Sequence, residues 1–193
     1  MIGRQNVPAP SLLAGEGTSA TLEDLSQRAR LGLKGPLAAA WLQQRAFTIP
    51  DRPNSWCAMT DDERDIIVRL GTSEFLLEQV SADAKLRTLA DELRSSIIGV
   101  YPVLREDRAF ALAGQAADVV LAEVCNVNFS GLPSDERHAV MTLMIGVAVT
   151  VVPQGKAARR RYLIWCDPTF GDYLWSSLQG VIADLGTSGG EGT

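Results

Sequence analysis

A ten-residue pattern occurs once in each half of the chain, and it constrains the fold more than any other feature of the sequence. Both copies read Leu-x-Gly-x-x-Ala-x-x-x-Leu, with the members Leu33, Gly35, Ala38 and Leu42 in the first copy and Leu112, Gly114, Ala117 and Leu121 in the second. Glycine lets a chain turn sharply out of a strand, alanine lets a helix approach a sheet closely, and the final leucine is buried one turn later. The pattern therefore predicts a strand, a turn and a helix in each half.

The hydrophobic periodicity around each copy extends this prediction. We expect strands at 29–33, 64–70, 74–80, 109–112, 140–152 (interrupted near Gly146) and 162–166, and helices at 36–45, 83–95, 116–124 and 169–185. Residues 48–60 contain Pro50, Pro53 and Asn54 and are expected to be a loop. The resulting class is α+β, with two similar βαββα halves of the split βαβ or ferredoxin-like type and helices covering one face.

The length of 193 residues suits one compact body built from two such halves. We predict a flexible N-terminal segment at 1–20, a single body at 21–185 and a disordered tail at 186–193. Within the body, the two pseudo-repeats are expected at about 29–98 and 107–185.

Charge and cysteine content exclude several classes of protein. The net charge of −5 disfavours a nucleic-acid partner, which requires a basic face. Cys57, Cys125 and Cys166 are too few and too widely spaced to indicate a disulfide framework or a zinc site, which favours a reducing compartment.

The first twenty residues lack the apolar core of a signal peptide, and the most apolar run, at 139–152, is too short to span a membrane. We expect a cytoplasmic protein that does not bind a membrane.

The sequence contains few residues suited to catalysis. We therefore predict no catalytic, cofactor-binding or metal-binding residues on this chain. The single histidine, His138, lies in a polar stretch typical of a solvated loop, and the cysteines have no histidine nearby in sequence. The carboxylate runs Glu23-Asp24 and Asp61-Asp62-Glu63 with Asp65 do not match a calcium loop. No dinucleotide or phosphate-loop fingerprint occurs.

Two clusters could instead form an interface. The first is a basic connection between two strands, formed by Lys156, Arg159, Arg160 and Arg161. It is either a solvated hairpin or a binding site for a phosphate or an acidic partner. Phe170, Tyr173 and Trp175 lie on the last helix, where Tyr173 and Trp175 cannot both face one core, so one of them could contact another chain. The residues alone thus indicate a subunit or a binding module.

Five segments, taken in order, resemble the gamma subunit of heterotetrameric sarcosine oxidase. They are the segments at 33–42, 53–56 (Pro-Asn-Ser-Trp), 69–78, 112–123 and 170–175 (Phe-Gly-Asp-Tyr-Leu-Trp). The resemblance covers about residues 31–185, and it implies the fold of the folate-binding aminomethyltransferase superfamily, in agreement with the two predicted halves.

The resemblance further implies a non-catalytic subunit in a cytoplasmic complex with alpha, beta and delta chains, serving assembly and support. Such a complex oxidatively demethylates sarcosine to glycine, with formaldehyde or methylene-tetrahydrofolate and hydrogen peroxide as the other products. FAD, FMN, NAD, tetrahydrofolate and zinc are then expected on the partner subunits and none on this chain. Trp56 or the aromatic residues of the last helix are expected to supply part of the contact surface.

Two alternatives remain open. Small subunits of related N-methylglutamate dehydrogenases look alike, because the flavin chain selects the substrate. The chain could also be a stand-alone folate-binding protein that uses a cleft between its halves, with Asp118 and Glu123 as candidate carboxylates in that cleft. The lysine-glycine-cysteine signature of folate-binding proteins of transfer-RNA modification is absent, which disfavours that branch.

Overall fold

Both copies of the repeated pattern form the predicted strand, turn and helix. The computed structural model describes residues 19–133, 136–155 and 160–188. In the first copy, β2 (Ala29–Lys34) ends at Gly35 and α1 (Ala38–Gln44) follows; in the second, β7 (Arg108–Gly114) ends at Gly114 and α3 (Ala117–Val124) follows. The glycine φ angles are +133° and +111°, in a region that favours glycine. The leucine and alanine members of both copies are buried, so the repeat is structural.

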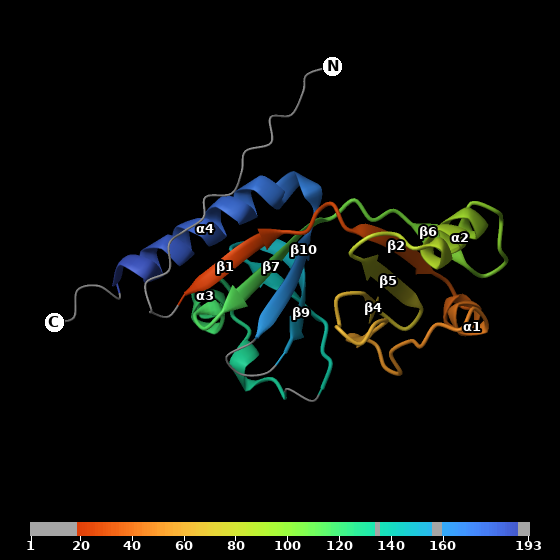
Figure 1. The fold of residues 1–193 in the computed structure, drawn as a ribbon, viewed down its shortest axis with the longest axis horizontal. Helices are drawn as coiled ribbons and strands as arrows, with labels where there is room; N and C mark the ends of the chain where they lie inside the picture. The colour runs from red at the N-terminus through yellow and green to blue at the C-terminus, as the bar shows by residue number, and fades with distance from the viewer. Residues whose placement is uncertain (1–18, 134–135, 156–159, 189–193) are drawn as a thin grey trace, which may run out of the picture.

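The first half forms a five-stranded antiparallel sheet, which we call the first sheet. Its strand order is β3 (Ser55–Ala58), β4 (Ile66–Arg69), β5 (Glu74–Gln79), β2 and β6 (Tyr101–Val103). Helix α2 (Ala84–Leu93) begins at the predicted position, where the Asp83 carboxylate accepts a hydrogen bond from Leu86 N at 2.7 Å. Together with α1, it packs on one face of this sheet (Figure 1).

The second half forms another five-stranded antiparallel sheet, the second sheet. Its strand order is β1 (Ala20–Asp24), β7, β10 (Arg161–Cys166), β9 (Val147–Gln154) and β8 (Val140–Met144). The predicted interruption near Gly146 is the turn between β8 and β9, where Ile145 and Gly146 both have positive φ. A 3-10 turn at Pro168–Phe170 leads into α4 (Gly171–Ser188), which packs with α3 on one face.

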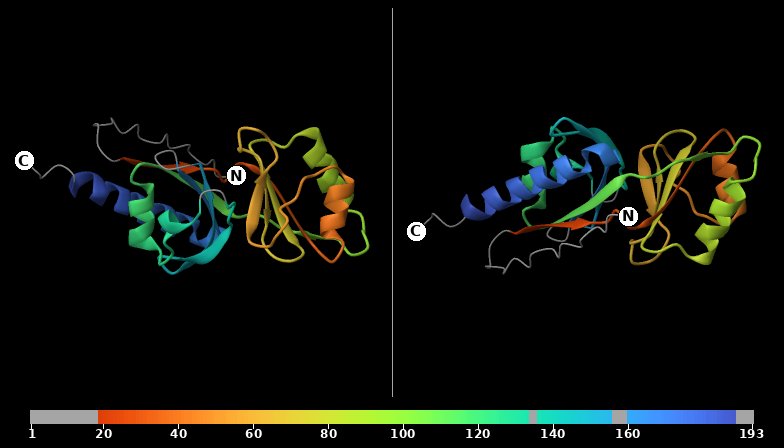
Figure 2. Two further views of the ribbon diagram at one scale, coloured as in Figure 1. Left: turned by 90° about the horizontal axis from the view of Figure 1, so that it is seen from below. Right: turned by 90° about the horizontal axis from the view of Figure 1, so that it is seen from above.

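The two sheets pack face to face, and the helices cover their outer faces. Alternation along β5 directs Phe75 and Leu77 toward α1 and α2, and Leu76 toward the second sheet. Alternation along β10 likewise directs Ile164 toward α3 and α4, and Trp165 toward the first sheet. Figure 2 shows the resulting order of helices, sheet, sheet and helices. The α+β class and the two similar halves are confirmed.

The structure corrects the prediction in three places. Ala20–Asp24 forms β1, which belongs to the sheet of the second half although it precedes the first. The expected loop at 48–60 contains β3, and the unpredicted β6 completes the first sheet. Helix α4 continues to Ser188, beyond the expected end at Leu185. The rest of the predicted flexible ends, at 1–18 and 189–193, lies outside the described residues.

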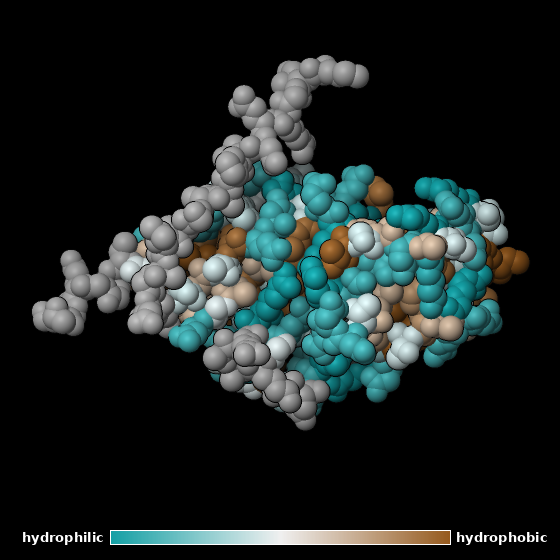
Figure 3. Space-filling model, in the orientation of Figure 1, coloured by the Kyte–Doolittle hydropathy of each residue, from teal (hydrophilic) through white to brown (hydrophobic). Residues whose placement is uncertain are grey.

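The surface of the described residues is mixed in character. On the face drawn in Figure 3, hydrophilic residues form a band between the two lobes, and hydrophobic side chains gather on either side of it. None of the described helices combines the length and the apolar character required to cross a bilayer.

Candidate functional site

The junction of the two sheets contains a buried charged cluster centred on Glu78. Its Oε2 accepts hydrogen bonds from Trp165 Nε1 and Arg30 Nε, each at 2.6 Å, and its Oε1 lies 3.3 Å from Arg28 Nη1. The Glu78 side chain is completely buried, and the two arginine side chains are nearly so. A carboxylate buried to this extent requires such partners, because burial without them is very costly.

Strand register explains why these residues meet. Arg30 on β2 lies directly opposite Glu78 on β5, so both side chains leave the sheet on the face toward the second sheet. Arg30 also donates to the Leu25 carbonyl at 2.7 Å and to the Asp107 carbonyl at 2.9 Å. These carbonyls belong to the two segments that connect the sheets, one between β1 and β2 and one between β6 and β7. The cluster therefore joins both connections to the sheet interface.

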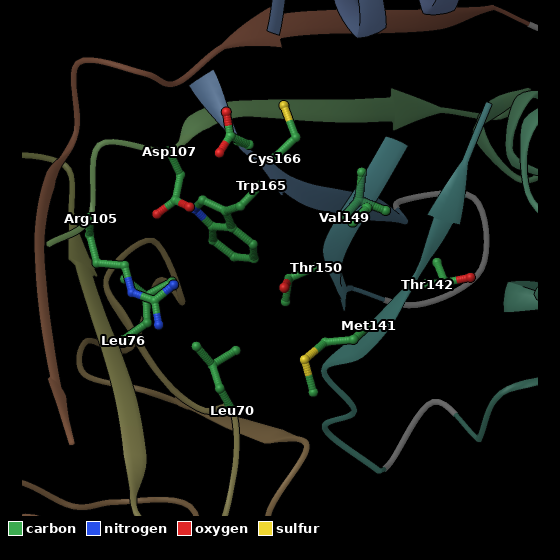
Figure 4. Close-up of a pocket in the computed structure, with 12 residues that line it drawn as sticks. Leu70, Leu76, Arg105, Asp107, Met141, Thr142, Val149, Thr150, Trp165 and Cys166 are labelled. Atoms are coloured by element: carbon green, nitrogen blue, oxygen red, sulfur yellow. The ribbon is translucent and has the colours of Figure 1, made fainter. Parts of the chain in front are cut away.

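A cavity of about 220 Å³ opens beside this cluster. Arg105 and Asp107 lie on one side of it, Leu70 and Leu76 of the first sheet below, and the second sheet on the other side (Figure 4). Ligand pockets for drug-sized molecules usually measure about 300 to 1,000 Å³. The cavity is thus smaller than a site that would enclose a molecule of that size.

The polar groups around the cavity are incompletely paired. Arg105 Nη2 contacts Glu74 Oε1 at 2.5 Å, but its Nε is buried without an acceptor among the described residues. Asp107 Oδ2 is likewise buried and receives no hydrogen bond from a described residue. Asp167 accepts from Thr169, whose hydroxyl and backbone N–H both lower the pKa of that carboxyl. The orphan donor and the orphan acceptor therefore belong to two residues that line one cavity.

The cysteines show no sign of reactivity. Cys125 and Cys166 are buried and Cys57 is half-buried, and all three are free thiols. Burial raises the pKa of Cys166 to about 11 and also raises the pKa of Cys57. Because the thiolate is the nucleophile, both groups stay in the unreactive form at neutral pH.

The predicted loop histidine and carboxylate runs have local structural partners. His138 Nε2 lies 3.0 Å from Glu136 Oε2, although the geometry is not that of a hydrogen bond. Asp62 accepts from Thr60 Oγ1 at 2.7 Å. Glu63 pairs with Arg137 at 2.7 Å. Among the residues at 19–133, 136–155 and 160–188, no three histidine, cysteine or carboxylate side chains are grouped as metal ligands would be.

The two carboxylates expected in a cleft between the halves lie elsewhere. Asp118 and Glu123 are on α3, on the outer side of the second sheet, and Glu123 is exposed. Asp118 accepts a hydrogen bond from the buried Tyr162 hydroxyl and lies 3.5 Å from Arg160 Nη1. The space between the halves holds the cavity described above and is otherwise packed by the inner faces of the sheets, and neither carboxylate lies there. The predicted placement of these carboxylates was therefore wrong.

The aromatic residues proposed for a partner interface separate into buried and exposed groups. Trp56 is only 4% exposed and packs between the sheets, so its expected role as a contact surface was wrong. Trp175 packs on Phe110 with ring centroids 5.3 Å apart. Phe170 and Tyr173 are each 51% exposed. Tyr173 and Trp175 thus face different surroundings, as predicted from their positions on one helix.

The described part of the basic connection is paired within the chain. Arg160 donates to the Phe129 carbonyl at 3.0 Å, and Arg161 pairs with Glu23 at 2.9 Å. Lys156 and Arg159 lie outside the described residues.

Sequence reasoning did not identify Glu78, Arg30 or Asp107 as members of a site. One signal was available for Glu78, which directly follows the apolar run Phe75-Leu76-Leu77 within a predicted strand. A charge inside such a strand indicates either an edge or a buried pair, and only the register distinguishes them.

Comparison with known proteins gives the fold. No family model matches the sequence, and no curated protein matches it. A chain of the heterotetrameric sarcosine oxidase from Corynebacterium sp. U-96, solved in complex with pyrrole 2-carboxylate, superimposes with a TM-score of 0.70 at 21% identity. The match covers 89% of this chain and 87% of that one. Aminomethyltransferase T of the glycine cleavage system from Bartonella henselae matches with a TM-score of 0.56 at 19% identity, over 84% of this chain and 46% of that one. The fold is thus the one that the sequence resemblance implied.

Proposed function

We propose that this chain is a non-catalytic, gamma-type subunit of a cytoplasmic, flavin-dependent complex that oxidises sarcosine. The observation that carries this proposal is the mutual coverage of the structural match, in which nearly all of this chain corresponds to nearly all of a chain from heterotetrameric sarcosine oxidase. The aminomethyltransferase, by contrast, is matched over less than half of its length. A body of this size and outline corresponds to a whole subunit of such an assembly.

In this proposal the chain supports assembly, and the chemistry belongs to its partners. FAD, FMN, NAD, tetrahydrofolate and zinc would be held by the alpha, beta and delta chains. The junction built on Glu78 would supply a rigid body for docking, since its charged groups are satisfied within the chain and hold both connecting segments.

The decisive experiment is purification of the tagged full chain from its native cells, followed by mass analysis and a visible absorption spectrum of the eluate. The proposal predicts copurified larger chains and the absorption of bound flavin. Turnover with sarcosine and with N-methylglutamate would then identify the substrate and distinguish the dehydrogenase alternative. A colourless chain of 20.8 kDa without partners would contradict the proposal.

Stand-alone folate binding is the second candidate, and the similarity of fold to an aminomethyltransferase favours it. The cavity at the junction is small for such a ligand. Titration of the purified chain with tetrahydrofolate, monitored by calorimetry, tests this candidate directly. Saturable binding would support it, and an absence of heat exchange up to millimolar ligand would remove it.

A further inference from the structure

We infer that the cavity between the sheets, together with the exposed part of the inner face of β8 and β9 at Met141, Leu143 and Ala148, receives a segment of a partner polypeptide that inserts an arginine or lysine side chain between apolar residues. This inference rests on the proposed function as a subunit. It adds the surface that is used and the chemistry of the segment that fills it.

The first observation is a stripe on the second sheet that runs from the buried junction to an exposed edge. Trp165, Thr150 and Met141 are directly paired across β10, β9 and β8, so their side chains share the inner face. Trp165 is 3% exposed and Met141 is 56% exposed. In the next row on the same face, Leu143 is 62% exposed opposite Ala148. Within the described part of the chain, the first sheet thus covers the Trp165 end of this face and leaves Met141 and Leu143 exposed at the β8 end.

The second observation is the electrostatic character of the cavity at the inner end of this stripe. Its charged lining residues are Arg105, Asp107 and Asp167, and Glu74 already neutralises Arg105. Two carboxylates therefore remain, and Asp107 Oδ2 is buried without a donor among the described residues. A cationic side chain in the cavity would pair with the Asp107 carboxylate through a charge-assisted hydrogen bond.

The third observation concerns the orphan donor. Arg105 Nε is buried without an acceptor among the described residues, and a backbone carbonyl beside the inserted cation would provide one. A peptide supplies a carbonyl, a cation and apolar side chains together, whereas a free cation supplies only one of them. Met141, which lines the cavity (Figure 4), and Leu143 in the next row of β8 then meet the apolar neighbours of the inserted residue. An apolar surround of this kind is the usual arrangement of an interface with a central anchor.

The first test uses the full chain labelled with 15N and a defined probe, the blocked tripeptide Leu-Arg-Leu, compared with Leu-citrulline-Leu. Citrulline keeps the shape of arginine and lacks its charge. We expect the indole N–H signal of Trp165, assigned with Trp165→Phe, to shift with the arginine peptide at millimolar concentration. The shift should be lost in Asp107→Asn and kept in the control Asp61→Asn, which changes an exposed carboxylate. Equal shifts with both peptides, no shift with either, or an unchanged shift in Asp107→Asn would overturn the inference.

The second test measures assembly of the tagged full chain in its native cells. Loss of a central anchor contact typically weakens binding by about tenfold or more, so Asp107→Asn and Met141→Ser should each reduce copurified partner accordingly. Asp61→Asn and Val119→Ser, which alters an exposed apolar residue on α3, should not. Because Asp107 Oδ2 is buried without a donor among the described residues, Asp107→Asn should leave the thermal stability of the isolated chain unchanged or raised.

The outcomes separate the inference from the proposed function. If equal amounts of partner copurify with the wild type, Asp107→Asn and Met141→Ser, the inference is overturned and the proposed subunit role is unaffected. An absence of partners with wild type would overturn the subunit role, and the peptide titration would then decide whether the cavity binds a cationic segment. Binding of free arginine as tight as that of the tripeptide would assign the cavity to a small molecule and contradict the docking surface.

Discussion

The indole Nε1 of Trp165 on β10 donates to Glu78 Oε2 on β5 at 2.6 Å, and this is a direct hydrogen bond between the two sheets. Both side chains are almost fully excluded from solvent. Because the same carboxylate oxygen also accepts from Arg30, the bond ties the second sheet to the residue that holds both connecting segments. One buried carboxylate therefore adds a polar link to the apolar packing that holds the two halves together.

Replacing that carboxylate should be strongly destabilising. Glu78→Gln keeps the shape of the side chain but leaves Arg28 and Arg30 without their buried counter-charge. Removing one partner of a buried ion pair costs about 3–5 kcal/mol, and urea unfolding at neutral pH measures this loss. Glu136→Gln breaks the exposed pair with Arg52 and should cost less than about 1 kcal/mol. Equal losses in the two variants would contradict the role assigned to Glu78.

Trp56 should contribute to stability through its packing and not through its N–H group. It is buried between the sheets, and its Nε1 has no acceptor among the described residues. Trp56→Ala should therefore lower the free energy of unfolding by about 3–5 kcal/mol, whereas Trp56→Phe should lower it much less. Thermal unfolding of both variants tests this. A Phe variant as unstable as the Ala variant would show that the indole N–H has a partner.

The two glycines of the repeat should be equally intolerant of a side chain. A Cβ atom on Gly35 would collide with the Gly99 carbonyl oxygen, and one on Gly114 with the Ser19 carbonyl oxygen. Positive φ adds strain, so each Gly→Ala variant should lose more than about 2 kcal/mol. Gly71→Ala is the matched control, because a Cβ there meets nothing within 4 Å. Denaturant unfolding that gave similar values for all three variants would be inconsistent with this account.

Stability should fall at alkaline pH because of Tyr162. Burial, followed by the hydrogen bond to Asp118, raises the pKa of its hydroxyl to about 12. The folded state thus holds this proton more tightly than the unfolded state, whose tyrosine pKa is about 10. The resulting stability is fully present below pH 10 and is lost as the pH rises from about 10 to 12. Tyr162→Phe should remove this part of the pH dependence, measured by unfolding across that range. An identical alkaline slope in wild type and variant would contradict the assignment.

Much of the local structure could be predicted from the sequence because its signals are local. The turn glycines of the repeated pattern and the hydrophobic periodicity around them each act over a few neighbouring residues. These signals identified the α+β class and the two halves. They could not identify the site, because Glu78, Trp165 and Asp107 come from separate segments, and no local pattern brings them together.

The sequence by itself determined most of the segments that become strands and helices, because the spacing of apolar residues within each segment is a local signal. Only the tertiary structure decided that β1 crosses into the second sheet, where Ala20 pairs with Gly114, and that Trp56 is covered by the opposite sheet. The physical reason is that strand pairing and sheet packing are interactions between residues distant in sequence. Short strands such as β3 and β6 carry weak local preferences, so their neighbours in space determine their conformation and what they bury.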